Sequence, residues 1–191
     1  YMQDPGYELK SDLYPLNVCY NVGLAFQRTA LTQNYHRTSK DFTFHALPTH
    51  PKEKREVYVM VVGETSRALN WQLYGYERET TPLLSRQSGL IAFPKVLTES
   101  NTTHKSVPML MSDATACNYD SIYHQKGIIT AFKEAGFRTA FFSNQRYNHS
   151  FIDFFGMEAD TYDFIKEDSV SSTYNPSDDE LLKLVERSEE R

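Results

Sequence analysis

Residues 57–67 have the sequence VYVMVVGETSR, in which an apolar run ends at a glycine and is followed at once by an acid and two hydroxyl side chains. Four of the first six residues are β-branched valines, and Tyr58 and Met60 keep the other positions apolar. A run of this composition predicts a strand that is buried on both faces of a parallel sheet. Glu64 would then lie at the carboxyl end of that strand, where open α/β sheets bind their ligands.

Glu64 has two interpretations when its position is considered alone. The carboxyl end of a buried strand makes it a candidate metal ligand or catalytic residue. An acid after a strand is also typical of the first turn of a helix, where the positive end of the helix dipole stabilises it. Thr65 or Ser66 would cap such a helix.

Two other polar segments follow apolar runs in the same way. Residues 98–108, TESNTTHKSVP, come after a short strand predicted near residues 90–93. Residues 143–149, SNQRYNH, come after a strand predicted over residues 137–142, which itself follows a predicted helix. Because the carboxyl ends of parallel strands meet at one edge, we expect the last of these segments to lie at the same rim as Glu64.

Three motifs taken in order resemble those of the phosphoethanolamine transferases in the alkaline phosphatase and sulfatase superfamily. They are GETSR at residues 63–67, LYGYERETTP at residues 73–82, and the SVP motif at residues 106–108 with a threonine three residues before its serine. The resemblance covers about residues 56–168. It implies an α/β fold of the alkaline phosphatase (sulfatase-like) type, with a mostly parallel sheet and helices on both faces.

The resemblance assigns roles to the residues at matching positions. Glu64 corresponds to a zinc ligand of the family, and Thr103 corresponds to the nucleophile, which also binds the zinc. In the family this threonine attacks the phosphorus of phosphatidylethanolamine, holds the phosphoethanolamine covalently and passes it to lipid A or another envelope glycan. Substrate-binding roles are implied for four residues: Lys105, Asn144, Gln145 and His149.

The implied chemistry suits these residue types. A threonine hydroxyl is a weak nucleophile until a base or a metal activates it. Zinc stabilises the alkoxide and neutralises charge on the phosphoryl oxygens, and a glutamate oxygen such as that of Glu64 is an acceptable ligand. A helix that starts near Lys105 or Ser106 would point free N–H groups at the phosphate, and Pro108 suits its first turn.

Each assignment has a plainer alternative that the residues leave open. Residues 98–106 would also form a polar capping loop, because hydroxyl side chains compete for backbone groups at helix starts. Only the register against the SVP motif selects Thr103 over Thr102 as the nucleophile. Lys105 is equally typical of a solvated basic side chain, and His149 of an ordinary histidine in a surface loop.

The composition fits a single α/β domain or a large part of one. The chain has 191 residues and a formal net charge of −5, with its lysines and arginines scattered along the sequence. This pattern disfavours nucleic-acid binding, which calls for clustered positive charge. No apolar run approaches the roughly 18 residues of a membrane span. The two cysteines, Cys19 and Cys117, leave the question of a disulfide open.

The sequence divides into a lead-in over residues 1–55 and the amino-terminal portion of a catalytic domain over residues 56–191. Apolar residues at helical spacing predict an amphipathic helix over residues 16–32. The polar, proline-containing stretch from 36 to 55 predicts a connector. A further helix is predicted directly after residues 177–180, which would cap it.

The predicted fold is incomplete. The family completes its zinc site with an Asp-His pair and further histidines in the second half of the domain, and no Asp-His pair occurs in this sequence. We therefore expect a truncated catalytic domain whose sheet exposes an edge strand and an apolar face, which favours a homodimer. In the family this domain follows membrane helices, which implies a location at the cell inner membrane with the domain facing the periplasm.

The leading hypothesis is a zinc-dependent transfer of phosphoethanolamine from phosphatidylethanolamine to lipid A or another envelope glycan, by a protein that is membrane-associated at full length. A second hypothesis is another hydrolase of the superfamily that acts on phosphate or sulfate esters. Cys117 lacks the proline and arginine of the sulfatase signature C/S-x-P-S-R, which disfavours a plain sulfatase. A third hypothesis is an inactive fragment that retains only the half-fold.

Overall fold

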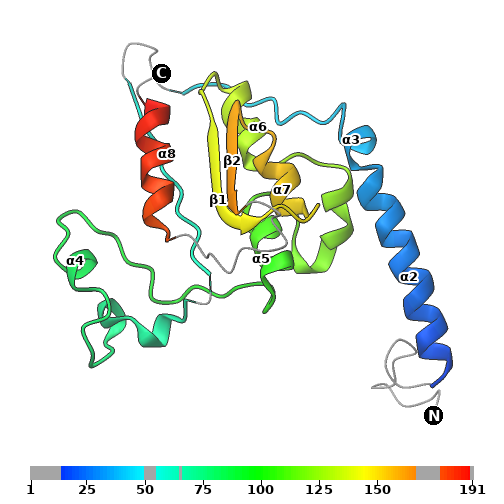
Figure 1. The fold of residues 1–191 in the computed structure, drawn as a ribbon, viewed down its shortest axis with the longest axis horizontal. Helices are drawn as coiled ribbons and strands as arrows, with labels where there is room; N and C mark the ends of the chain where they lie inside the picture. Colours follow the sequence, from blue (N-terminus) through cyan, green and yellow to red (C-terminus); the bar gives the residue numbers. More distant parts are fainter. Residues whose placement is uncertain (1–13, 50–54, 65, 167–176, 190–191) are drawn as a thin grey trace.

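The fold is centred on a two-stranded parallel sheet, which lies in the middle of Figure 1. Strand β1 (Ala140–Arg146) follows helix α6 (Ile128–Glu134), and helix α7 (Phe151–Gly156) leads from β1 to strand β2 (Thr161–Lys166). The order strand, helix, parallel strand is the βαβ unit from which parallel sheets are built. The computed structural model describes the following residues: 14–49, 55–64, 66–166 and 177–189.

Helix α7 packs closely against this sheet. Pairing between the strands runs without interruption from Ala140 to Ser143, and an irregularity follows before Arg146. A Cβ atom at Gly156 would lie 2.4 Å from the ring of Phe141. A glycine is therefore needed where the helix meets the strand, because a larger residue would push the two apart.

The helix predicted before Gly136 and the strand predicted after it are both confirmed, but the strand starts later than predicted. Helix α6 ends at Glu134, and Gly136 has a φ of 86°, the left-handed conformation that commonly ends helices. The N–H of Phe137 then donates to the carbonyl of Phe132 at 3.0 Å and closes the helix end. Strand β1 begins only at Ala140, after Thr139, whose N–H and hydroxyl bond to Asp160.

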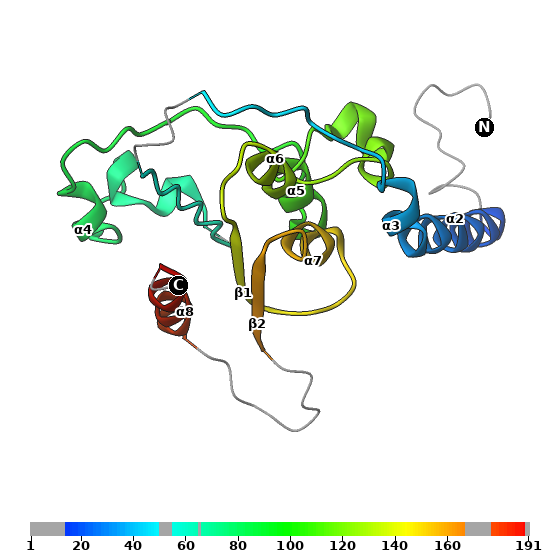
Figure 2. The same ribbon diagram turned by 90° about the horizontal axis from the view of Figure 1, so that it is seen from above.

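Helices lie on both sides of the sheet (Figure 2). On one side, helix α5 (Thr103–Leu110) packs with α7, and the 3₁₀ segment η3 (Ala116–Tyr123) packs with α5. On the other side, helix α8 (Asp179–Glu189) contacts β1. The predicted α/β class, with a parallel sheet between helices, is confirmed. The helix predicted after residues 177–180 is confirmed by α8.

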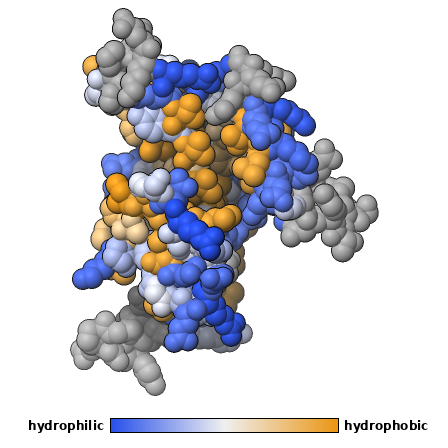
Figure 3. All heavy atoms as spheres, turned by 90° about the vertical axis from the view of Figure 1, so that its left-hand side faces the viewer, coloured by the Kyte–Doolittle hydropathy of each residue, from blue (hydrophilic) through white to orange (hydrophobic). Residues whose placement is uncertain are grey.

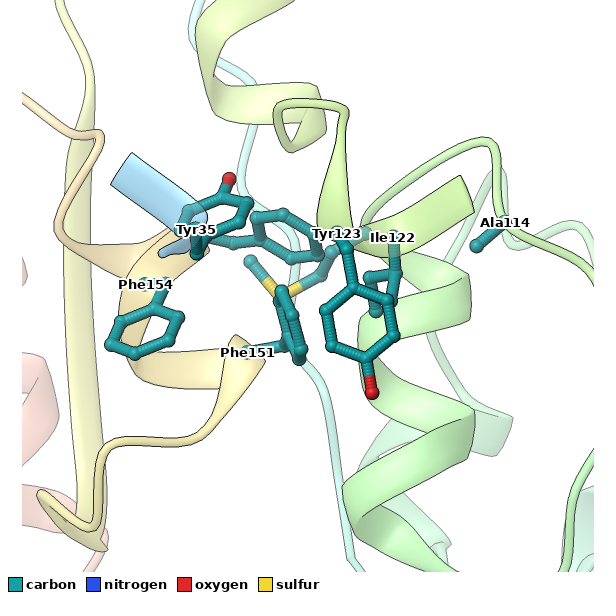
Figure 4. Packing of buried hydrophobic residues seen from close by; sticks show 8 residues of the cluster. Tyr35, Ala114, Ile122, Tyr123, Phe151 and Phe154 are labelled. Atoms are coloured by element: carbon teal, nitrogen blue, oxygen red, sulfur yellow. The ribbon is translucent and has the colours of Figure 1, made fainter. Parts of the chain in front are cut away.

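The hydrophobic core lies between α7 and η3 and is completed by a ring from the lead-in (Figure 4). Tyr35, from the short helix α3 (Tyr35–Thr38), is only 1% exposed. Its ring stacks on Phe154 at 5.3 Å and meets Phe151 edge to face at 5.2 Å. The other buried members of this cluster are Met111, Ala114, Ile122, Tyr123 and Phe155.

A buried hydrogen-bond network ties Tyr35 to the turn after α7. Its hydroxyl donates to Oε1 of Glu158 at 3.0 Å and lies equally close to the carbonyl oxygen of Gln125. Glu158 also accepts from the N–H of Gly127 and the hydroxyl of Thr130. Burial raises the pKa of the Glu158 carboxyl, and burial together with the adjacent Glu158 raises the pKa of Tyr35. These partners satisfy polar groups that are otherwise costly to bury.

A second polar joint holds together the turns that precede the two strands. Oδ2 of Asp160 accepts from the N–H and the hydroxyl of Thr139, at 2.9 and 3.0 Å. Oδ1 of Asp160 pairs with the ammonium group of Lys133 at 3.0 Å. The backbone hydrogen bond from Thr139, followed by the hydrogen bond from Lys133, lowers the pKa of Asp160 to about 2.

Helix α2 (Leu16–Gln33) confirms the helix predicted over residues 16–32. It buries none of its residues and extends away from the sheet in both views (Figures 1 and 2). Within the described ranges, no helix combines the length and the apolar character that a membrane crossing requires. Cys19 on α2 and Cys117 on η3 are both exposed and do not form a disulfide.

The strands predicted over residues 57–62 and near residues 90–93 are not formed, and these two predictions were wrong. Both stretches are irregular and unpaired, and the side chains of residues 57–62 are between 43% and 87% exposed. A strand needs a hydrogen-bonding neighbour and cover for its apolar side chains. The described residues supply no paired strand to these stretches, and they leave most of the apolar side chains exposed although Tyr58 packs against Phe132 and Phe137. Apolar side chains consequently gather on the face of the molecule that carries α8 (Figure 3).

Residues 66–97 form a lobe that projects from the sheet (Figure 1). The lobe is held by hydrogen bonds of its own. The hydroxyl of Thr80 accepts from the N–H of Gln72 at 2.9 Å and donates to the carbonyl of Asn70 at 2.7 Å. Its helical turns are all short: η1 (Ala68–Asn70), η2 (Gln72–Tyr74) and α4 (Pro82–Ser85).

The helix cap predicted after Glu64 is wrong for Ser66. The first helical turn in this region begins at Ala68 and has no side-chain cap. The hydroxyl of Ser66 instead accepts a hydrogen bond from the indole N–H of Trp71 at 2.7 Å. The other candidate cap, Thr65, lies outside the described residues.

Candidate active site

Three segments that are far apart in the sequence meet at the carboxylate of Glu64. The hydroxyl of Thr103 donates to Oε1 of Glu64 at 3.0 Å. The side-chain amide of Gln145 donates to Oε2 of the same carboxylate at 2.7 Å. Glu64 follows the irregular segment 55–63, Thr103 begins α5, and Gln145 lies near the carboxyl end of β1. All three side chains belong to exposed residues, so the cluster is open to a ligand from solvent.

The start of α5 decides where the Thr103 hydroxyl points. The helix begins at Thr103, two residues earlier than the sequence predicted, and Thr102 precedes it with an extended backbone. The carbonyl of Thr102 accepts from the N–H groups of Lys105 and Ser106, at 3.0 and 2.9 Å. Thr103 is therefore the first helical residue, where side chains flank the unpaired N–H groups of the helix end.

The hydroxyls of Thr102 and Thr103 have different hydrogen-bond partners. The hydroxyl of Thr102 lies 3.2 Å from that of Ser100, within the loop that precedes the helix. Glu99, in the same loop, accepts from the backbone N–H of Ala116. Polar groups of the loop therefore bond to one another and to the backbone, as expected for a capping loop. The hydroxyl of Thr103, in contrast, donates to Glu64.

Pro108 lies in a different place from the one that the sequence predicted. We expected it in the first turn of the helix, but it is the sixth residue of α5 and is buried. Proline has no N–H to donate, so the carbonyl of His104 loses its helical partner. The hydroxyl of Tyr119 lies 3.5 Å from that carbonyl and supplies a donor. The prediction was wrong because the helix begins at Thr103 instead of near residue 105.

An irregularity at the end of β1 directs Gln145 toward Glu64. Regular pairing with β2 stops after Ser143, and the N–H of Gln145 turns to the Ser143 hydroxyl at 3.1 Å. Irregularities of this kind re-aim side chains at the ends of strands and are common beside active sites. Neighbouring Asn144 points elsewhere, because its amide donates to Oδ1 of Asp178 at 2.8 Å, directly before α8.

The two remaining candidates have no hydrogen bond to the cluster in the part of the chain that the structure describes. Lys105 is exposed in the first turn of α5, two residues after Thr103. His149 is exposed in the loop after β1, has a positive φ of 59°, and its ring lies 4.5 Å from that of Tyr147. The structure therefore brings Glu64, Thr103 and Gln145 together, and it places Lys105 and His149 on adjoining segments.

The cluster offers two oxygen donors of the kind that zinc accepts. A carboxylate and a hydroxyl are both oxygen donors that zinc accepts, and two ligand atoms of a tetrahedral zinc site stand roughly 3.3 Å apart. The 3.0 Å between Thr103 Oγ1 and Glu64 Oε1 is close to that spacing. Across the described ranges, no group of three or more histidine, cysteine, aspartate or glutamate residues is placed to hold a metal ion. Glu64 and Thr103 thus fit as two ligands, and a complete site needs further ones.

The contacts of Asn144 and Gln145 are the features that sequence reasoning missed. The family resemblance assigns both residues to substrate binding, and both follow the same predicted strand. The strand in fact extends through both residues, and successive side chains of a strand point to opposite faces, so a strand predicted to run further would have separated them. Their observed partners, Asp178 and Glu64, lie on different segments.

Comparison with known proteins places the chain in a family. Residues 56–190 match the sulfatase family. The phosphoethanolamine transferase EptA of Escherichia coli (strain K12) is 37% identical over 95 residues, which make up 48% of this chain and 17% of that protein. The phosphoethanolamine transferase OpgE of the same strain is 30% identical over 141 residues, or 72% of this chain and 26% of that protein.

A solved structure also resembles the chain. It is the crystal structure of the C-terminal periplasmic domain of EcEptC from Escherichia coli in complex with zinc, with a TM-score of 0.61 and 25% identity. The match covers 66% of this chain and 37% of that domain, and the chain spans about a quarter or less of the two curated relatives. These matches confirm the resemblance that the motifs indicated. The chain belongs to the sulfatase family, and the relatives that it resembles there are phosphoethanolamine transferases.

Proposed function

We propose that this chain carries the nucleophile of a phosphoethanolamine transferase, with Thr103 as the attacking residue and Glu64 as its partner. The observation that carries the proposal is the 3.0 Å contact between the Thr103 hydroxyl and the Glu64 carboxylate. A hydroxyl at that distance from an acceptor is oriented for loss of its proton, which a threonine needs before it can attack.

The proposed reaction has two steps. In the first, Thr103 Oγ1 forms a bond to the phosphorus of phosphatidylethanolamine, the bond from phosphorus to the glyceride oxygen breaks, and diacylglycerol leaves with the threonine proton. In the second, a hydroxyl of lipid A or another envelope glycan attacks the phosphorus, and its proton returns to Thr103 as the threonine leaves. Between the two steps, the phosphoethanolamine is held covalently on Thr103.

The position of Thr103 on α5 supports stabilisation of the phosphoryl group. The first N–H groups of a helix have no partners within the helix, and they favour anions. A phosphoryl group bound to Thr103 would lie beside that helix end. Lys105 in the same turn adds a positive charge, which favours the charged oxygens of the transferred group.

The remaining candidates are proposed to recognise the substrate. Amide and imidazole groups can accept from the ethanolamine ammonium or donate to phosphate oxygens. The end of β1 and the loop after it carry such groups: Gln145, which contacts Glu64, Asn144, and His149. Together with Lys105, they would fix the head group while the diacylglycerol part remains outside the cluster.

Zinc is the proposed cofactor, held by Glu64 and Thr103 with further ligands. When bound, zinc would stabilise the threonine alkoxide and the charge on the phosphoryl oxygens. The crystallised EcEptC domain in complex with zinc supports this proposal, and its description as a periplasmic domain supports a location at the inner membrane facing the periplasm. We further propose that residues 1–55 form a lead-in and that residues 56–191 belong to the catalytic domain.

A covalent trapping experiment tests the proposed function. The protein is incubated with zinc and phosphatidylethanolamine without an acceptor, digested, and analysed by tandem mass spectrometry. We expect phosphoethanolamine on Thr103, with none on Thr102, and its loss in Thr103→Ala. Turnover of simple phosphate or sulfate esters without a phosphoethanolamine adduct would instead favour a hydrolase of the same family. Absence of both activities would favour an inactive fragment.

A further inference from the structure

We propose that Gln145 is a positioning residue that fixes the orientation of the Glu64 carboxylate. The inference rests on the role proposed above for Glu64. The two oxygens of this carboxylate have different partners, because Oε2 accepts from the Gln145 amide at 2.7 Å and Oε1 accepts from the Thr103 hydroxyl at 3.0 Å. With Oε2 held by Gln145, Oε1 is the atom that faces Thr103.

Glu64 needs such a partner because its own surroundings are open. It is exposed and follows the irregular segment 55–63, which is not part of a strand, so a sheet does not hold its backbone. A glutamate side chain has several rotatable bonds, and an exposed one samples several rotamers. Partners that hydrogen-bond the ligands of a metal orient those ligands, and their loss typically weakens metal binding by roughly 10–100-fold.

Gln145 is well suited to hold the carboxylate. It lies near the end of β1, which pairs with β2, and its own N–H bonds to the Ser143 hydroxyl at 3.1 Å. The amide is an uncharged donor, so it orients Glu64 without neutralising the negative charge that attracts a cation. An amide carries two N–H donors and a carbonyl oxygen, so a bond to Glu64 is compatible with a further contact to substrate.

The adjacent residue shows that this arrangement is specific to one side of the strand. Asn144 has the same amide chemistry, but its side chain donates to Asp178 at 2.8 Å and therefore links β1 to the start of α8. Two neighbouring amides thus serve two different carboxylates. Only Gln145 acts on the carboxylate that Thr103 also contacts.

The test compares Gln145→Met, which keeps the length of the side chain and removes the donor, with Gln145→Glu, which replaces the donor by a charged acceptor. The matched control is Gln87→Met, the same exchange at an exposed glutamine after α4. Zinc affinity is measured by competition with a chelator, and the KM and kcat for phosphatidylethanolamine are measured at saturating zinc. Thermal unfolding establishes that each variant is folded, and Gln145→Ala replaces Gln145→Met if the methionine variant is unfolded.

We expect zinc affinity to fall about 10–100-fold in Gln145→Met and at least as far in Gln145→Glu, with Gln87→Met equal to the wild type. Wild-type zinc affinity in Gln145→Met, with a raised KM, would overturn the positioning role while leaving the proposed transferase intact. A wild-type protein that neither binds zinc nor transfers phosphoethanolamine would overturn the proposed function and this inference with it.

Discussion

The hydroxyl of Thr103 lies 3.0 Å from Oε1 of Glu64, although 39 positions of sequence separate the two residues. Neither residue follows a paired strand, yet the two meet, because the start of α5 and the end of segment 55–64 approach the same end of β1. A nucleophile and a carboxylate in contact form a site whose parts can be tested separately.

Replacement of Thr103 tests the nucleophile. Thr103→Ala removes the hydroxyl, and we expect transfer to fall by about 10³-fold or more, as is usual when a covalent nucleophile is lost. Thr103→Ser retains a hydroxyl and should retain part of the activity. Thr102→Ala is the matched control, because its hydroxyl bonds within the preceding loop. Steady-state transfer rates give the measurement, and equal losses in the two alanine variants would contradict the assignment.

Replacement of Glu64 tests the metal ligand. Glu64→Gln preserves the shape of the side chain and removes its negative charge, which a zinc ligand contributes to binding. We expect zinc content, measured by elemental analysis after dialysis, to fall well below that of the unmodified protein. Glu186→Gln, on the exposed face of α8, should leave zinc content unchanged. Retention of zinc by Glu64→Gln would exclude Glu64 as a ligand.

Acid stability depends in part on Asp160, whose pKa is lowered to about 2 by hydrogen bonds from Thr139 and Lys133. A carboxyl whose folded pKa is depressed contributes stability above its unfolded pKa of about 3.9, and this contribution is lost as the pH falls toward 2. The wild type should therefore be more stable than Asp160→Asn at pH 6, with a gap that narrows between about pH 4 and 2. Urea unfolding across this range would show a constant gap if the prediction is wrong.

Substitution of Tyr35 tests the contribution of the lead-in to the core. Tyr35→Ala leaves a cavity among Phe151, Phe154 and Phe155 and should cost about 3–5 kcal/mol. Tyr35→Phe keeps the ring and removes the donor to Glu158, which should cost about 1–3 kcal/mol. Urea denaturation measures both changes. The same loss in both variants would mean that the hydroxyl, and not the packing of the ring, accounts for the effect.

The exposed apolar segment over residues 57–62 predicts self-association. Unpaired apolar stretches beside a sheet commonly pair with a second copy, and exposed patches of this kind mark interfaces. Size-exclusion chromatography with light scattering should give a dimer mass for the chain at micromolar concentration. Val59→Lys with Val61→Lys should shift it to a monomer. A compact monomer of the unmodified chain would contradict the prediction.

Local signals predicted the helices of this chain better than its strands. Helices α2 and α8 match their predicted positions closely, because apolar spacing and capping residues act over a few neighbouring positions. Residues 57–62 have the composition of a buried strand, but composition cannot supply the neighbour that a strand must pair with. The family resemblance selected Glu64 and Thr103, and periodicity alone gave no indication that they touch.

The sequence did not predict the polar contacts between distant residues. The hydroxyl of Tyr35 meets groups that lie 90 and 123 positions later, and the stretch that follows Tyr35 is polar enough to predict a connector. The contact between Gln145 and Glu64 depends on the irregularity after Ser143, and local composition did not indicate that irregularity.

The burial of Tyr35 has a practical consequence for anyone who redesigns or shortens proteins of this type. The part of the chain that the family match recognises begins at residue 56, so a gene trimmed to that boundary would encode every motif and still omit a ring from the hydrophobic core. Its product would contain Glu64 and Thr103 but would lack the ring that stacks on Phe154 and meets Phe151 edge to face. Chimeras that exchange catalytic portions between relatives should therefore be joined before residue 35.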